Sequence, residues 1–278
     1  MDVKLLPDTQ KIIENFIQTR VKEAEVTGVV IGLSGGVDSA TTLALAVSAL
    51  GSENVKGLIM PFIHTESVEL ASSHAESLNV EVKELNISSV VESFKAKTDS
   101  FSSKASEGNL HSRVRMTFLY GEAFHTGSLV MGTSNKSELL VGYYTKWGDG
   151  ASDFLPIGDL YKSQIYLLAK DLGIPKTILD RKPTAELWEG QTDEDELGID
   201  YATLDQILLG LERQLSFKRI SSKTGINPEY VERIGYLIKL SIHKRVFPPV
   251  CKIGRRTVGL DWRAVSYTHL TLPTILLV

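Results

Sequence analysis

A glycine-rich segment with a carboxylate inside it is the first feature of this 278-residue chain that could do chemistry. Residues 32–39 read GLSGGVDS, after the short apolar run 29–31 and before an Ala/Leu-rich stretch. A strand, a tight turn and a helix start are therefore expected in succession. Adjacent glycines let a ligand approach the backbone closely, and the amides at a helix start favour an anion. The pattern predicts a phosphate-binding loop.

Asp38 distinguishes the predicted loop from an ordinary glycine-rich turn. A carboxylate beside phosphates is repulsive unless a cation lies between them, and Mg²⁺ is the natural cation because proteins hold it with one or two carboxylates plus phosphate oxygens. Ser34 and Ser39 add hydroxyl donors. No lysine occurs between Lys22 and Lys56, so this is not a GK[ST] loop, and the GxGxxG spacing of a dinucleotide fingerprint is also absent.

The surrounding pattern shows which elements position the loop. Short apolar runs predict strands at 29–33, 55–60, 80–87 and 129–132, and amphipathic stretches predict helices at 8–26, 40–50, 65–78, 89–98 and 110–125. This alternation is typical of an α/β fold with a doubly wound, mostly parallel sheet, whose ligands bind at the carboxyl ends of the strands. The polar residues 100–107 predict a loop.

The C-terminal part has a different character. Helices are predicted at 160–172, 201–211 and 228–241, as a helical appendage to a single domain spanning residues 1–264. Residues 265–278 contain no Asp, Glu, Lys or Arg, unlike everything before them. We expect this tail to be non-native or disordered, and it takes no part in the functional interpretation.

Composition excludes several classes of function. The net charge of −4 gives no reason to expect a nucleic-acid partner. Cys251 is the only cysteine, so a single chain can form neither a disulfide nor a thiolate zinc site. No apolar run approaches the roughly 20 residues that span a bilayer, and the first residues do not resemble a signal peptide. We expect a cytoplasmic protein with no membrane partner.

The residues SGGVDS at 34–39 resemble the pyrophosphate loop of the ATP pyrophosphatase (PP-loop) superfamily. Its members cleave ATP between the α and β phosphates and adenylate a carboxylate, a carbonyl or a base. NAD synthetase, GMP synthetase, asparagine synthetase and tRNA thiolases share the loop, so these six residues do not choose among them. The resemblance implies an adenine nucleotide alpha hydrolase-like fold.

A second segment distinguishes among the families that share this loop. Residues 132–162 read GTSNKSELLVGYYTKWGDGASDFLPIGDLYK, a turn-rich mixture of acids, bases and aromatic residues that suits either a ligand-facing segment or a charged surface loop. It resembles the signature region of NAD synthetases. Further elements of that family are resembled, in order, by GNLHSRVRM at 108–116, KPTAEL at 182–187, DEDELG at 193–198 and HKR at 243–245. The resemblance extends to about Pro249.

The resemblance implies roles for individual residues. Those that would bind ATP are Gly32, Leu33, Ser34, Gly35, Gly36, Val37, Asp38, Ser39, Thr133, Lys162 and Thr184. Those that would bind deamido-NAD are Arg113, Lys146, Asp149, Asp153, His243 and Lys244. Asp38 and Glu138 would bind Mg²⁺. The contacts to adenine are open, with His64 and Ser67 as candidates, and the acidic run 193–196 would form a lid.

The implied reaction is the ATP-dependent amidation of deamido-NAD to NAD by ammonia, through an adenylated carboxylate, with release of AMP and pyrophosphate. Asp38, Lys162 and Asp149 would be the catalytic residues: Asp38 holds the metal, Lys162 supplies a point charge, and Asp149, near Asp153, holds and deprotonates an arriving ammonium ion. The implied reaction requires no protein nucleophile, and no Cys/His signature for one is present. Nothing in 278 residues resembles a glutaminase domain, so free ammonia is expected. The family resemblance also implies a homodimer.

Two alternatives stay open. One is another PP-loop ATP pyrophosphatase, either an amidating or a tRNA-modifying ligase, although the missing cysteine pair and the acidic charge disfavour tRNA modification. The other is a nucleotide-binding module without turnover. The presence of both Asp38 and Glu138 argues against it, because binding alone does not need a pair of metal ligands.

Overall fold

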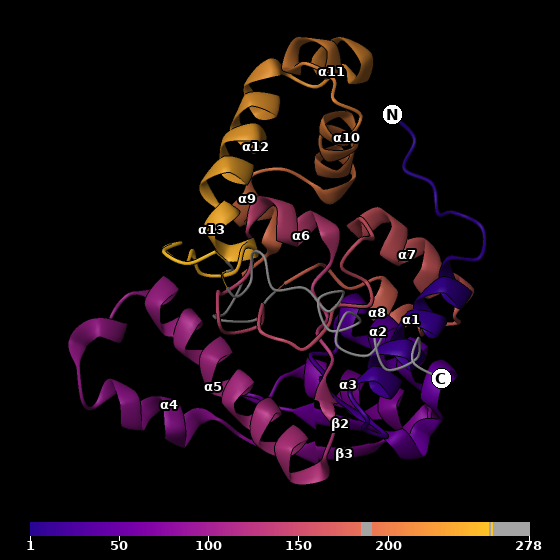
Figure 1. The fold of residues 1–278 in the computed structure, drawn as a ribbon, viewed down its shortest axis with the longest axis vertical. Coiled ribbons are helices and arrows are strands. Elements are labelled where there is room, and N and C mark those ends of the chain that lie inside the picture. The colour runs from indigo at the N-terminus through magenta and orange to yellow at the C-terminus, as the bar shows by residue number, and fades with distance from the viewer. Residues whose placement is uncertain (185–190, 256, 258–278) are drawn as a thin grey trace, which may run out of the picture.

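The computed structural model describes residues 1–184, 191–255 and 257, so the predicted non-native tail at 265–278 lies outside the described residues. A parallel four-stranded sheet lies at the centre of the α/β part, with the strand order β3-β2-β1-β4 (Figure 1). The strands are β1 (Val29–Gly32), β2 (Val55–Ile59), β3 (Glu81–Glu84) and β4 (Leu129–Val130). The predicted doubly wound parallel sheet is confirmed.

Helices cover both faces of the sheet because its central strand is apolar on both sides. Val29 and Ile31 of β1 point into one core, and Val30 points into the other. The first core is completed by α1 (Thr9–Glu23), α2 (Val37–Leu50), α3 (Glu66–Ser77), α7 (Lys162–Asp171) and α8 (Lys176–Leu179). The second is completed by α4 (Ser88–Lys95) and α5 (Lys104–Thr126).

A third core lies outside the sheet and forms the predicted C-terminal helical appendage. It is built by α6 (Lys136–Val141), α10 (Tyr201–Glu212), α11 (Phe217–Thr224) and α12 (Pro228–Leu240). In Figure 1, α10, α11 and α12 lie at the top, away from the strands, and α6 lies below them. Val141 at the end of α6 packs into this core, so a residue that follows β4 closely ties the appendage to the sheet.

Most differences between the predicted and the observed elements are short helices. The predicted loop 100–107 is wrong at its end, because α5 begins at Lys104 with a capping box formed by Ser103 and Ser106. Among the described residues, five more helices of four to eight residues were not predicted: α6, α8, α9 (Asp193–Leu197), α11 and α13 (Ile242–Arg245). Segments this short have too few turns to show a helical period.

In the part of the chain that the structure describes, no helix is both long enough and apolar enough to cross a membrane.

Candidate active site

The strand order locates the site. β1 pairs with β2 on one side and with β4 on the other, so the chain changes direction across the sheet between β1 and β4. The loops at the carboxyl ends of two such strands diverge and leave a crevice, where ligands of doubly wound sheets bind. The glycine-rich loop leaves β1, and residues 131–135 leave β4. Both loops that carried predicted ATP and metal ligands therefore meet at this crevice.

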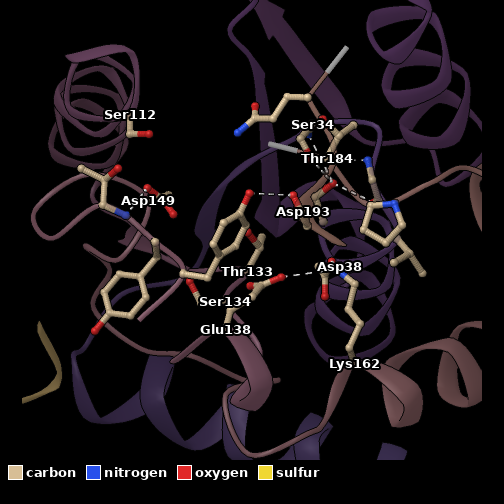
Figure 2. A pocket seen from close by; sticks show the side chains of 18 of the residues that line it. Ser34, Asp38, Ser112, Thr133, Ser134, Glu138, Asp149, Lys162, Thr184 and Asp193 are labelled. Atoms are coloured by element: carbon tan, nitrogen blue, oxygen red, sulfur yellow. Dashed lines mark hydrogen bonds and ion pairs between the residues drawn. The ribbon is translucent and has the colours of Figure 1, made fainter. Parts of the chain in front are cut away.

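Three predicted residues come together there. Lys162, at the first position of α7, is buried, and its Nζ forms an ion pair with Oδ2 of Asp38 on α2. The same Nζ lies 3.3 Å from Oε1 of Glu138 on α6. Figure 2 shows the lysine directed between the two carboxylates. Residues as far as 124 positions apart in the sequence thus form one charged cluster.

Asn135 was not predicted, although it joins the two carboxylates. Its side-chain Oδ1 accepts from the backbone N–H of Glu138 at 3.0 Å, which caps α6. Its Nδ2 donates to Oδ1 of Asp38 at 2.9 Å. The asparagine is completely buried, so both bonds are shielded from water. The spacing Asn-x-x-Glu at 135–138 is a capping-box signal that could have predicted both α6 and this residue.

The cluster perturbs its own ionisation. Burial raises the pKa of Glu138 to about 8, with the Lys162 ammonium acting in the opposite direction and the Asp38 carboxylate adding to the rise. Burial alone would lower the pKa of Lys162, but Asp38 and Glu138 hold that pKa above its usual value. A second cation would relieve the repulsion between the two carboxylates. Strongly perturbed groups at a crevice are typical of functional sites.

The residues present fit a magnesium ion that is completed by a ligand. Among residues 1–184, 191–255 and 257, no three His, Cys, Asp or Glu side chains form a metal-binding group. Two carboxylates, Asp38 and Glu138, are however the donor set with which proteins hold Mg²⁺ when phosphates supply further oxygens. The chemistry of the donors therefore matches a metal–nucleotide complex better than a metal bound by protein alone.

A pocket of about 370 Å³ opens over this cluster. That volume is in the range of small-molecule sites. Predicted site residues that line it are Ser34, Gly36, Val37, Asp38, Ser39, Thr133, Glu138, Asp149, Lys162, Thr184 and Lys244. In Figure 2, Asp149 and Ser112 lie on one side of the pocket, and Ser34, Asp38 and Thr184 lie on the other. The pocket thus joins the loop from β1 to the signature segment.

Asp149 lies at the far end of the pocket from Lys162, and its carboxylate is held by hydrogen bonds of its own. Its Oδ1 accepts from the backbone N–H of Thr145 at 2.9 Å, and its carboxylate also interacts with the hydroxyl of Ser112. Although the pocket reaches this side chain, the protein around it desolvates the carboxylate and raises its pKa. A carboxylate held in this way is a plausible acceptor for a proton or an ammonium ion.

Several predicted residues lie outside the pocket lining. In the glycine-rich loop, Leu33 packs into the core of the sheet, and Gly35 lies against the backbone of Ser67, where a Cβ would be 2.3 Å from the carbonyl oxygen. Gly32 does not line the pocket either. These residues shape the loop, and none of them presents a side chain to the pocket. Neither adenine candidate, His64 or Ser67, lines the pocket.

The residues assigned to deamido-NAD divide into two groups. Asp149 and Lys244 line the pocket, whereas Arg113, Lys146, Asp153 and His243 do not. Lys146 Nζ donates a hydrogen bond to the carbonyl of His243 at 2.6 Å, and the Arg113 guanidinium donates one to the carbonyl of Lys146 at 3.4 Å. These three residues therefore form a surface cluster. Asp153 Oδ2 instead accepts from the backbone N–H of Val130 in β4 at 2.7 Å.

Arg115 was not predicted as a site residue, although it lies in the segment GNLHSRVRM at 108–116. The α5 residues that line the pocket are Ala105, Asn109, Ser112 and Arg115, at steps of three or four. That spacing is one face of a helix, and Arg113 is off it. Arg115 also donates from Nε to the carbonyl of Met60 at 2.9 Å, which fixes it at the end of β2. Because Asn109 and Arg113 are also four residues apart, the spacing within GNLHSRVRM alone does not separate the two arginines, and the structure does.

The acidic segment contacts the site. Asp193 of α9 is buried and accepts hydrogen bonds from the hydroxyls of Tyr143 and Tyr201, each at 3.2 Å. Tyr143 also donates to Glu196. Both acids line the pocket, so the predicted lid segment lies over it. Residues 185–187 of the predicted KPTAEL element are outside the described residues.

Comparison with known proteins tests the origin of this arrangement. Residues 9–248 match the family model for NAD synthase. The NH3-dependent NAD⁺ synthetase of Thermococcus kodakarensis is 48% identical over 237 residues, which cover 85% of this chain and 93% of that protein. Among solved structures, the NMN synthetase from Francisella tularensis has a TM-score of 0.80 at 35% identity and covers 90% of this chain and 100% of its own. The NH3-dependent NAD synthetase from Campylobacter jejuni, in complex with the nitrate ion, has a TM-score of 0.76 at 33% identity, over 88% of this chain and 98% of its own.

The family match begins in α1 and ends just beyond α13, so it spans the sheet, the charged cluster and the helical appendage together. It also contains both halves of the crevice, the loop after β1 and the segment after β4. The chain belongs to the NAD synthase family.

Proposed function

We propose that this chain is a cytoplasmic ligase that amidates deamido-NAD to NAD, using ATP and ammonia and releasing AMP and pyrophosphate. The observation that carries the proposal is the meeting of Asp38, Glu138 and Lys162 in a pocket that extends to Asp149. A nucleotide site and a site for an acceptor carboxylate can share such a pocket. The names of relatives 48% identical to the chain support the same reaction.

The first step brings two anions together. A carboxylate oxygen of the nicotinate attacks the α-phosphorus of ATP, and the bond from that phosphorus to pyrophosphate breaks. The start of α2 presents backbone amides to the leaving phosphates, and Ser34 and Ser39 add hydroxyls beside it. Lys162 is already charged and fixed, so it stabilises developing negative charge without rearranging at the moment of reaction.

The proposed metal is Mg²⁺, held by Asp38 and Glu138. When bound with ATP, it would screen the phosphate charge that the nicotinate carboxylate must approach. Burial raises the pKa of Glu138, and Asn135 holds Asp38 in place by the hydrogen bond that its Nδ2 donates. These two carboxylates therefore have a fixed separation before any nucleotide enters.

The second step forms the amide. The nitrogen of ammonia attacks the acyl carbon, the bond from that carbon to the AMP oxygen breaks, and one proton is lost overall. Asp149 is the proposed acceptor of a proton from ammonium, because it lines the pocket and its pKa is raised by desolvation. Asp153 does not share this role in our proposal, since its carboxylate accepts from the backbone of β4.

A homodimer would explain the remaining predicted contacts. Arg113, Lys146 and His243 cluster on the surface, outside the pocket of one chain. Large apolar side chains are exposed nearby in sequence, on α12, α13 and the segment that follows: Tyr236, Leu240, Ile242, Phe247 and Val250. We propose that a second copy covers this surface and that the cluster binds the part of deamido-NAD that extends beyond the pocket. Sedimentation velocity should give a dimer, and a monomer would refute this part.

The test of the reaction is a coupled assay with deamido-NAD, ATP, Mg²⁺ and ammonium. NAD is detected by alcohol dehydrogenase and AMP is quantified in parallel, beside an Asp38→Ala control. We expect NAD and AMP in equal amounts, both lost in the control. AMP without NAD would indicate another ATP pyrophosphatase, and no AMP under any condition would indicate a nucleotide-binding module.

The Francisella relative provides a second candidate substrate. It is an NMN synthetase with a TM-score of 0.80 to this chain, so the same fold is associated with a mononucleotide product. The corresponding reaction would amidate nicotinate mononucleotide at the same carboxylate. Comparing kcat/KM for deamido-NAD and nicotinate mononucleotide decides between them, and we expect deamido-NAD to be preferred.

A further inference from the structure

A buried carboxylate behind the site has no place in the reaction described above. Asp205 on α10 is completely buried and does not line the pocket. A carboxylate inside a protein is costly unless its oxygens accept hydrogen bonds. Helix α10 packs against both α6 and α7, the two helices whose first turns carry Glu138 and Lys162 (Figure 1).

The hydrogen bonds of Asp205 reach both helices. Oδ1 accepts from the hydroxyl of Ser137 on α6 at 2.5 Å. Oδ2 accepts from the backbone N–H of Ser163 on α7 at 2.8 Å and from its hydroxyl at 2.6 Å. The hydroxyl oxygen of Ser137 in turn accepts from the backbone N–H of Lys162 at 3.0 Å. One carboxylate therefore closes a ring of bonds between the two helix starts.

These hydrogen bonds pair backbone N–H groups at the start of α7. The first N–H groups of a helix have no partner inside the helix, and an anion near them is favourable. Ser163 and Lys162 are the first two residues of α7, and Asp205 and Ser137 satisfy their N–H groups from outside. Each serine is next in sequence to a member of the charged cluster: Ser137 precedes Glu138, and Ser163 follows Lys162.

We propose that Asp205 is a positioning residue: it fixes the first turns of α6 and α7 to each other and thereby sets the Glu138 carboxylate against the Lys162 ammonium. This inference rests on the proposed function, because it assigns Asp205 to the geometry of that site. A displacement of about 1 Å between reacting groups can cost about 100-fold in rate. The carboxylate acts through Ser137 and Ser163 and touches no reacting atom.

The helix does not depend on Asp205 for its place in the fold. Leu204, Ile207 and Leu208 on the same helix are at most 1% exposed and pack into the appendage core. An Asp205→Asn variant should therefore keep α10 docked. The amide carries no charge and has one acceptor oxygen where the carboxylate has two. If that oxygen accepts from the Ser163 N–H, the amide nitrogen faces the Ser137 hydroxyl, which can then accept but no longer donate.

The test compares Asp205→Asn with Asp200→Ala in the full chain. Asp200 caps the same helix by accepting from the N–H of Thr203 at 2.8 Å, and its bonds stay within α10. Asp205→Asn changes the bonds between α6 and α7, whereas Asp200→Ala removes a cap that belongs to α10 alone. Measurements are kcat, the Mg²⁺ concentration at half-maximal rate, Mg·ATP binding by calorimetry without the other substrates, and thermal unfolding.

We expect Asp205→Asn to lower kcat about 10- to 100-fold and to raise the half-maximal Mg²⁺ concentration. Asp200→Ala should lower only the midpoint of thermal unfolding. Equal kcat and Mg²⁺ dependence in both variants would overturn the proposal, whatever their stability. If Asp205→Asn does not fold, Ser163→Ala and Ser137→Ala each remove one bond of the ring and should show the same rise in Mg²⁺ requirement in smaller degree.

The outcome separates the two proposals. If the wild-type chain binds Mg·ATP but forms no NAD, the proposed reaction fails, while weaker Mg·ATP binding in Asp205→Asn than in Asp200→Ala still supports positioning. If the wild-type chain forms NAD and the two variants bind Mg·ATP alike and react at the same rate, positioning alone fails. Absence of Mg·ATP binding by the wild-type chain would overturn both.

Discussion

Stability in acid should depend on one buried histidine, His111 of α5. Its side chain is 1% exposed and stacks on Phe62, with 4.2 Å between ring centroids. Neither ring nitrogen has a hydrogen-bond partner among the described residues. Burial and the nearby Arg115 lower the pKa of His111 from 6.5 to about 4, and Glu107, 3.9 Å away, opposes this. The neutral imidazole is therefore the form that fits the fold.

The sign of the effect follows from the two pKa values. The unfolded chain takes up this proton near pH 6.5, and the folded chain resists until about pH 4. The unfolded state thus binds more protons in between, so the stabilisation present above pH 6.5 is lost as the pH falls through this window. At about 1.4 kcal/mol per pH unit, the full loss is about 3 kcal/mol, and most of it has occurred by about pH 4.5.

The assay is urea unfolding followed by circular dichroism at about pH 7 and about pH 4.5. His111→Phe keeps a ring against Phe62 and removes the group that titrates. We expect it to lose about 2 to 3 kcal/mol less of its free energy of unfolding between the two pH values than the wild-type chain does. His125→Gln, exposed on the same helix, is the control and should behave as wild type.

Other charged groups do not account for the expected difference. Lys95 and Glu92 also act on His111 from the neighbouring helix α4, and they are present in every variant. His74 is another buried histidine with a lowered pKa, which it keeps in all three proteins. Equal pH dependence of the free energy of unfolding in His111→Phe and wild type would refute the reasoning.

Three further predictions concern the site. Lys162→Met should lower kcat about 100- to 1,000-fold, because it removes a fixed charge and leaves two carboxylates facing each other; steady-state rates test this, and near-normal turnover would contradict it. Arg115→Gln should raise the KM for ATP more than Arg113→Gln does, because only Arg115 lines the pocket, and equal KM values in the two variants would count against that assignment. Asn135→Ala should lower the free energy of unfolding by about 1 to 2 kcal/mol through loss of the cap on α6, and should weaken Mg·ATP binding, both measurable on the purified chain; an unchanged unfolding curve would exclude the cap.

The sequence predicted those parts of the fold that local chemistry decides. β1, β2 and β4 lie in short runs that are mostly β-branched or apolar, and the turn after β1 is defined by two glycines and a helix start within eight residues. Pairing order could not be predicted, because it depends on which strands bury each other's faces. The six-residue helix α6 was missed because its length hides the period, although Asn135 and Glu138 form its capping box.

The sequence predicted which residues belong to the site better than it predicted which way their side chains face. Asp38, Glu138 and Lys162 were all assigned from motifs, and the structure brings them together. Arg113 and Asp153 also came from motifs, but neither lines the pocket. A motif indicates that a residue belongs to the region of the site, whereas helix phase and backbone partners decide whether its side chain faces the ligand.

Asp153 and Asp205 show why this second step needs the structure. Both carboxylates accept from backbone N–H groups, Asp153 from β4 and Asp205 from the start of α7. The first lies inside the signature segment and was expected at the substrate. The second lies in a helix with no motif and was not singled out, although its bonds reach the neighbours of Glu138 and Lys162. Because those partners are 42 and 68 residues away, only the folded chain reveals that the helical appendage takes part in the geometry of the site.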